Sequence, residues 1–193
     1  PIPSPNLVLK SHAHVPQIAS YGLTTTYGLS MGVYTGTVLV PILLGQRHQQ
    51  TGLSATGALL GATLGGAVGF GYSAIGDTTL ENAHGLIHYQ SLGLLAGIGL
   101  GNFFGSRGNS EGLEYNSGLL GSVGGLLLAI GMKSAHLNDH GSLLWGTYAA
   151  LLTAAGGIPL GLLFQFDGDA TLGLGIAPAS LVGLFTSLAL APL

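Results

Sequence analysis

The chain has 193 residues, of which 47% are hydrophobic, 35 are glycine and none is cysteine. Only 6% are charged, whereas soluble domains contain about 25% charged residues. This composition excludes an ordinary soluble surface and, with a mean hydropathy of +0.57, a disordered chain. Four basic residues are too few to neutralise a nucleic-acid backbone, so nucleic acid is excluded as a partner. The lack of cysteine excludes disulfides and thiol catalysis.

Residues 1–20 contain prolines at positions 1, 3, 5 and 16. Such spacing favours an extended, polyproline-like conformation, and we predict an extended N-terminal arm followed by a second domain at 21–193. The stretch has neither an initiator methionine nor a signal-peptide pattern. We therefore expect a processed chain or a segment of a longer protein.

The positions of the charged residues indicate how the rest of the chain is organised. They recur about every 30 residues, which is the length of one membrane-spanning helix and its connection. Long uncharged segments lie between the clusters, which are Lys10; Arg47; Asp77 and Glu81; Arg107, Glu111 and Glu114; Lys133 and Asp139; and Asp167 and Asp169. The spacing therefore predicts one membrane crossing in each interval.

Six helices are predicted, at 21–44, 52–75, 86–104, 113–132, 143–164 and 172–190. Thr78 with Glu81 has the spacing of a capping box before the third helix. Asn138 or Asp139 can cap the fifth helix, and Asp169 or Thr171 the sixth.

Short connections place consecutive helices antiparallel. The predicted fold is thus an all-α, antiparallel bundle of about six glycine-rich, apolar, transmembrane helices, located in a membrane. The two sides receive equal numbers of basic residues, so the sequence assigns no orientation.

Two other folds compete with this one. An eight-stranded outer-membrane β-barrel can be built from a chain of this length, but 38 leucines and 20 alanines against eight valines favour helices. A soluble, glycine-rich helical packing module could also hold the polar residues of segment 86–104. A soluble bundle needs a polar stripe on each helix, and the second, fourth and sixth segments lack one.

The glycines recur every four residues, which places them on one face of each helix. In a membrane, such small-residue faces let helix backbones approach closely. The pattern is that of a glycine zipper, and it predicts helix-packing roles for Gly28, Gly32, Gly36, Gly57, Gly61, Gly65, Gly69, Gly93, Gly97, Gly101, Gly121 and Gly125.

Histidine is the one abundant side chain suited to metal or proton chemistry. His84 and His88 are four residues apart on one helix, and in an antiparallel bundle they lie on the same side as the connection that contains His136, Asp139 and His140. These five residues form a candidate site for a divalent metal, the one cofactor that the sequence suggests. A simpler interpretation places the histidines at helix ends as unpaired, amphipathic residues.

Two serines match hydrolase patterns only superficially. Ser30 stands in a G-x-S-x-G string that belongs to the glycine repeat, and Ser142 follows Asp139 and His140. Neither has the expected structural context.

The sequence therefore favours a non-enzymatic integral membrane protein with a structural, assembly or pore-forming role. Its expected partners are the lipid bilayer and other membrane subunits or further copies of itself. The alternative is a membrane-embedded subunit that binds a metal or cofactor through the histidines.

Overall fold

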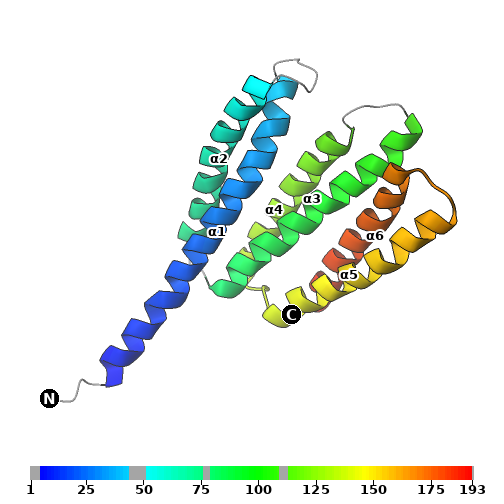
Figure 1. The fold of residues 1–193 in the computed structure, drawn as a ribbon. Coiled ribbons are helices and arrows are strands. Elements are labelled where there is room, and N and C mark those ends of the chain that lie inside the picture. Colours follow the sequence, from blue (N-terminus) through cyan, green and yellow to red (C-terminus); the bar gives the residue numbers. More distant parts are fainter. Residues whose placement is uncertain (1–4, 44–50, 76–78, 109–112, 193) are drawn as a thin grey trace. The chain divides into compact units, whose positions relative to one another are not determined.

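The computed structural model describes residues 5–43, 51–75, 79–108 and 113–192, with side chains at 17–38, 40, 55–75, 79–105 and 116–192. These residues form six helices and no strand, so the all-α prediction is confirmed and the barrel alternative is wrong for them (Figure 1). The helices are α1 (Pro5–Leu43), α2 (Thr51–Ala74), α3 (Leu80–Gly108), α4 (Leu113–Ser134), α5 (His140–Leu163) and α6 (Gly168–Ala189).

Helix α1 differs most from its predicted bounds. It begins at Pro5, so residues 5–20 are helical, where an extended arm was expected. Proline is well tolerated in the first turn of a helix because its missing N–H has no intrahelical acceptor there. The chain divides into two compact units, residues 1–83 and 84–193.

Helices α1 and α2 of the first unit pack antiparallel along their glycines. A Cβ atom on Gly28 would overlap the carbonyl oxygen of Gly65, and one on Gly36 would overlap that of Gly57. Gly32 and Gly61 face one another in the same way. The residue number therefore rises by four along α1 and falls by four along α2 from one glycine pair to the next, and the two backbones are in contact at each pair.

The second unit repeats this arrangement. Gly93 of α3 faces Gly121 of α4, and Gly97 faces Ser117. A Cβ on Gly125 would overlap the carbonyl oxygen of Tyr89. All of the predicted packing glycines other than Gly101 have such a close neighbour across a helix pair, and Gly101 is buried. Glycine is needed along these seams because a side chain would separate the helices.

Helices α5 and α6 also approach closely. Gly146 lies against Gly183 of α6, and Gly161 lies against Thr171 near the other end of the pair. Helix α6 in turn contacts α3, because a Cβ on Gly99 would lie 2.6 Å from the backbone nitrogen of Ala177. The second unit is thus a set of helices in which small residues form the contacts.

Three helices are long and apolar enough to cross a membrane within the described residues. They are Asn116–Ser134, His140–Leu163 and Gly168–Ala189. The prediction of six such helices is therefore supported for α4, α5 and α6. Helix α3 contains several polar residues.

Side chains cap the helices at positions close to those expected. Asp139 caps α5, as predicted, and accepts a hydrogen bond from Ser142 N at 2.9 Å. Helix α6 is capped by Asp167, which accepts from Ala170 N at 2.7 Å, so the choice of Asp169 or Thr171 was wrong. The helix begins earlier than expected because Gly168 and Asp169 are already helical.

At α3, the predicted cap Thr78 lies outside the described residues. The hydroxyl of the next residue, Thr79, accepts a hydrogen bond from Asn82 N at 3.3 Å. Thr79 therefore satisfies one of the free N–H groups in the first turn of α3.

Helices α4 and α5 end in the same backbone motif. His136 and Gln165 have positive φ angles of 57° and 55°. After α4, Leu137 N donates to Met132 O at 2.9 Å and His136 N to Lys133 O at 3.1 Å. This is the Schellman arrangement, in which the residue with positive φ is usually glycine.

We expect His136→Gly to stabilise the protein by about 0.5 kcal/mol. A left-handed conformation costs a residue with a Cβ about 1–2 kcal/mol, and the lost backbone freedom of glycine offsets about 0.5–1 kcal/mol of that gain. Denaturant titration followed by circular dichroism would measure the change. Ala135→Gly, at the preceding position, is the control and should not stabilise; equal gains from both variants would contradict the explanation.

Candidate functional site

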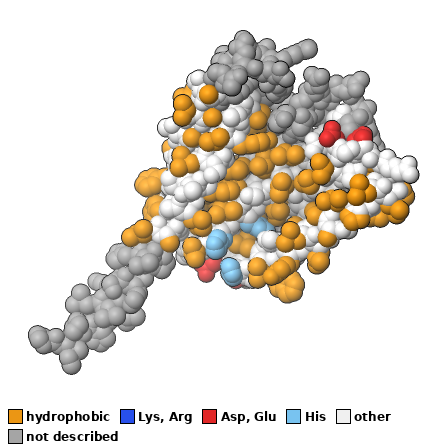
Figure 2. Space-filling model, viewed as in Figure 1, with side chains coloured by type: hydrophobic (Ala, Val, Ile, Leu, Met, Phe, Trp, Pro, Cys, Tyr) orange, Lys and Arg blue, Asp and Glu red, His pale blue; other side chains and the backbone are white. Residues whose placement is uncertain are grey.

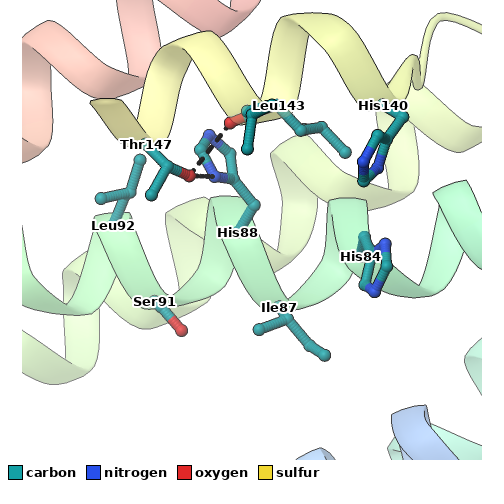
Figure 3. Close-up of a pocket in the computed structure, with 9 residues that line it drawn as sticks. His84, Ile87, His88, Ser91, Leu92, His140, Leu143 and Thr147 are labelled. Carbon is teal, nitrogen blue, oxygen red and sulfur yellow. Dashed lines mark hydrogen bonds between the residues drawn. The ribbon is translucent and has the colours of Figure 1, made fainter. Parts of the chain in front are cut away.

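The most connected polar side chain of the second unit is His88 of α3. Its Nδ1 lies 3.2 Å from the hydroxyl of Thr147 on α5 (Figure 3). Its Nε2 lies 2.6 Å from the hydroxyl of Ser187 on α6. Each hydroxyl also contacts a carbonyl oxygen of its own helix, Leu143 O for Thr147 and Gly183 O for Ser187, both at 3.0 Å. One imidazole therefore connects three helices.

The protons available to this network fix how it can be arranged. A neutral imidazole has one N–H, and each hydroxyl has one O–H. The network has four contacts but only these three protons. One hydroxyl therefore donates to the ring and not to the carbonyl oxygen of its own helix. His88 is consequently held at both nitrogens, and neither is left to bind a ligand.

Ser187 and His88 form a close serine and histidine pair, but the geometry does not suit nucleophilic catalysis. Ser187 is fully buried, and a Cβ on Gly146 would overlap its hydroxyl oxygen. A substrate carbonyl therefore has no room to approach that oxygen. The group on Nδ1 is a threonine hydroxyl, whereas a catalytic triad has a carboxylate there.

The serines of the two hydrolase-like strings also have structural contacts. The hydroxyl of Ser30 donates to Thr26 O at 3.1 Å, within α1. Ser142 is buried, and its hydroxyl donates to Asp139 O at 2.9 Å in the first turn of α5. Neither is paired with a histidine in the described contacts.

A pocket of about 400 Å³ opens beside His88, between α3 and α5. Its lining is mainly apolar, but it includes three imidazole rings, those of His84 and His88 from α3 and that of His140 from α5 (Figure 3). The lining residues are His84, Ile87, His88, Ser91, Leu92, His140, Leu143, Leu144 and Thr147. The pocket is therefore a candidate site for a ligand that combines an apolar part with a group able to contact imidazole nitrogen.

His84 and His140 lie together at one end of this pocket. Their ring centroids are 5.8 Å apart and the rings are tilted by 40°. The loop before α5 is packed onto α3, because the side-chain amide of Asn138 occupies the space beside Gly85. This contact places the first residue of α5 opposite the first turns of α3. The expectation that the two histidine clusters meet is correct for this pair.

The remaining residues of the predicted metal site are used elsewhere. His136 lies in the turn after α4, where its Nδ1 is 3.1 Å from Lys133 O. Asp139 caps α5 with its carboxylate. Within the described residues, no group of three histidine, cysteine, aspartate or glutamate side chains could hold a metal ion. The five-residue site is therefore not assembled, and only His84 and His140 come together.

Sequence reasoning did not identify Thr147 and Ser187 as partners of His88. They lie 59 and 99 residues away along the chain, and hydroxyl residues are common in every helix. One signal was present: Gly183 and Ser187 are four residues apart, which places two small residues on one face of α6. That spacing indicates a close helix contact but does not identify its partner.

Comparison with known proteins gives no relative of this chain, because no family model, curated protein or solved structure matches it.

Proposed function

We propose that this chain is an integral membrane protein with a structural or assembly role, built from helix pairs that pack through glycine. The distribution of residue types between interior and surface carries the proposal. The buried polar residues are mainly serines and threonines, whereas large hydrophobic side chains are on the outside (Figure 2). A soluble protein would expose such large apolar patches only at a binding site.

Helices α5 and α6 show this distribution most clearly. The buried positions of α6 are all glycine, alanine, serine or threonine. On α5, Leu152 is 75% exposed and Trp145 is 63% exposed, and Phe185 of α6 is 67% exposed. Small residues between helices and large apolar residues outside are typical of helices that pack within lipid.

Hydroxyl groups that are exposed or half-buried support the same proposal. Thr63 is exposed, yet its hydroxyl donates to Leu59 O at 2.9 Å, one turn earlier in α2. Thr153 of α5 donates in the same way to Ala149 O at 2.8 Å. In lipid, a hydroxyl without such a partner would be costly, because no water is available.

The charged side chains that the structure describes lie at helix ends. Glu81 and Asp169 are in first turns, Lys133 is in the last turn of α4, and Asp139 and Asp167 are caps. Helix α5 has 24 residues, or about 36 Å, which exceeds the hydrocarbon thickness of about 30 Å. The ends of α5 and α6 would therefore reach the polar interface of the bilayer.

A packing role is proposed in preference to a pore because backbone contacts close the helix pairs. Along α1 and α2, and again along α3 and α4, a single methyl group has no room between the helices. Such pairs are stable units for assembly in a membrane. The partners are then the lipid bilayer together with other membrane subunits or further copies of this chain.

The absence of cysteine makes the proposal easy to test by labelling. In membranes that contain the Leu152→Cys variant, we expect a membrane-impermeant maleimide to react slowly, because the thiol would lie in hydrocarbon near the middle of α5. After solubilisation in SDS, the reaction should become rapid. Labelling yield, measured by gel shift before and after solubilisation, gives the comparison.

Ala135→Cys is the matched control, because residue 135 is exposed in the turn after α4. This thiol should react in open membranes without SDS. Rapid labelling of both variants without SDS, or recovery of the protein in the soluble fraction after cell lysis without detergent, would contradict the membrane assignment.

A further inference from the structure

We propose that His84 and His140 bind a divalent transition-metal ion at the end of the pocket between α3 and α5. The site lies within the second unit, and its existence does not depend on the structural role proposed above. It differs from the predicted five-residue site because it omits His88, His136 and Asp139. Remaining coordination positions would be filled by water or by a small ligand that enters the pocket.

The first argument is the availability of the ring nitrogens. His88 uses both of its nitrogens in contacts with hydroxyls. The described residues provide no hydrogen-bond partner for the rings of His84 and His140, which contact one another. Imidazole nitrogen is a preferred ligand of Zn²⁺, Cu²⁺ and Ni²⁺. Two free imidazoles that meet across two helices are therefore the part of the pocket suited to a metal.

The second argument is geometric. With metal–nitrogen distances of about 2.0–2.1 Å and tetrahedral angles, the centroids of two imidazoles on one ion lie about 5 Å apart. The centroids of His84 and His140 are 5.8 Å apart, with the His84 ring on α3 and the His140 ring on α5 (Figure 3). His140 is exposed, so its ring can turn to close the remaining distance without disturbing the core.

The surroundings determine which ion the site would hold. The pocket lining contains no carboxylate, and Asp139 uses its side chain at the helix cap. The hard cations Mg²⁺ and Ca²⁺ require oxygen ligands, so they should bind weakly or not at all. Without second-shell partners that fix the rings, the affinity for Zn²⁺ should be lower than that of a closed structural site.

The test is equilibrium dialysis of Zn²⁺ against the untagged chain in detergent, carried out in a His12→Ala/His14→Ala background that removes the histidines near the N-terminus. We expect one Zn²⁺ per chain in that background. His84→Gln and His140→Gln should each weaken binding at least about 10-fold, because each removes one of two protein ligands. His136→Gln is the matched control and should bind Zn²⁺ unchanged. Circular dichroism would show that the variants remain helical.

Cu²⁺ gives a second measurement that needs no substitution at the site. Its electron paramagnetic resonance spectrum should show coupling to two equivalent imidazole nitrogens. Absence of Zn²⁺ binding, unchanged binding in either glutamine variant at the site, loss of binding in His136→Gln, or a Cu²⁺ spectrum without two imidazoles would each overturn the proposal.

Discussion

Gly121→Ala is expected to destabilise the second unit by about 2–3 kcal/mol. The added methyl group would overlap the carbonyl oxygen of Gly93 and lie 2.9 Å from its carbonyl carbon, so α3 and α4 would have to separate. Inserting a methyl group into a closely packed contact usually costs about 1–3 kcal/mol, and backbone atoms cannot move aside as a side chain can. SDS titration in mixed micelles, followed by the emission of Trp145, would measure the loss.

Gly124→Ala is the control, because it lies on the same helix and a methyl group there would have no neighbour within 4 Å. Alanine is favoured over glycine in a helix by about 1 kcal/mol, so this variant should be neutral or stabilising. A similar loss of stability in both variants would show that any side chain added to α4 destabilises the unit, whether or not it lies at the contact with α3. No loss in Gly121→Ala would show that α3 and α4 do not pack through this seam.

His88→Ala is expected to destabilise the second unit by about 2–4 kcal/mol. The substitution removes contacts to two other helices, each worth about 1 kcal/mol, and leaves a void where the ring had packed. His84→Ala, one turn earlier on α3, should change stability by less than about 0.5 kcal/mol because its ring is only partly buried and its ring contact is with the exposed His140. The same SDS titration compares the two.

A double-mutant cycle would separate the contact between His88 and Ser187 from other effects. If the 2.6 Å contact is formed, the effects of His88→Ala and Ser187→Ala should be non-additive by about 1 kcal/mol. Additive effects would mean that His88 stabilises the unit by packing alone. In that case the imidazole would not join α3 to α6 by a hydrogen bond.

The six helices could be predicted because charge and turn residues mark their ends. Helix α4, predicted at 113–132, extends over Leu113–Ser134, and α5 begins three residues before its predicted start. Helix α3 was predicted too short at both ends, since segments 80–85 and 105–108 show no apolar period. At the start of α3, the hydroxyl of Thr79 caps the helix, and a hydropathy pattern does not record such a contact.

The candidate site could be predicted only in part. Antiparallel topology and the positions of the loops were enough to bring His84 near His140. The role of His88 was not predictable, because it depends on the depth at which α5 and α6 cross α3. That depth is fixed by Gly146 and Gly183, whose lack of side chains lets Ser187 approach the ring. Spacing along one helix cannot give the relative height of three helices.

Glycine repeated every four residues has a further consequence for the alignment of each pair. If α2 slid along α1 by four residues, or about 6 Å, most glycines would again oppose glycines, and the shifted pairing would cost little. One contact at the end of the seam distinguishes the two alignments: the hydroxyls of Thr24 and Ser73, both fully buried, are 2.5 Å apart. Gln90 Nε2 donates to the hydroxyl of Ser122 at 3.2 Å between α3 and α4. Each pair of glycine-lined helices thus has one polar side-chain contact. These few hydroxyls and amides select one axial alignment of the helices among several that the glycines would tolerate.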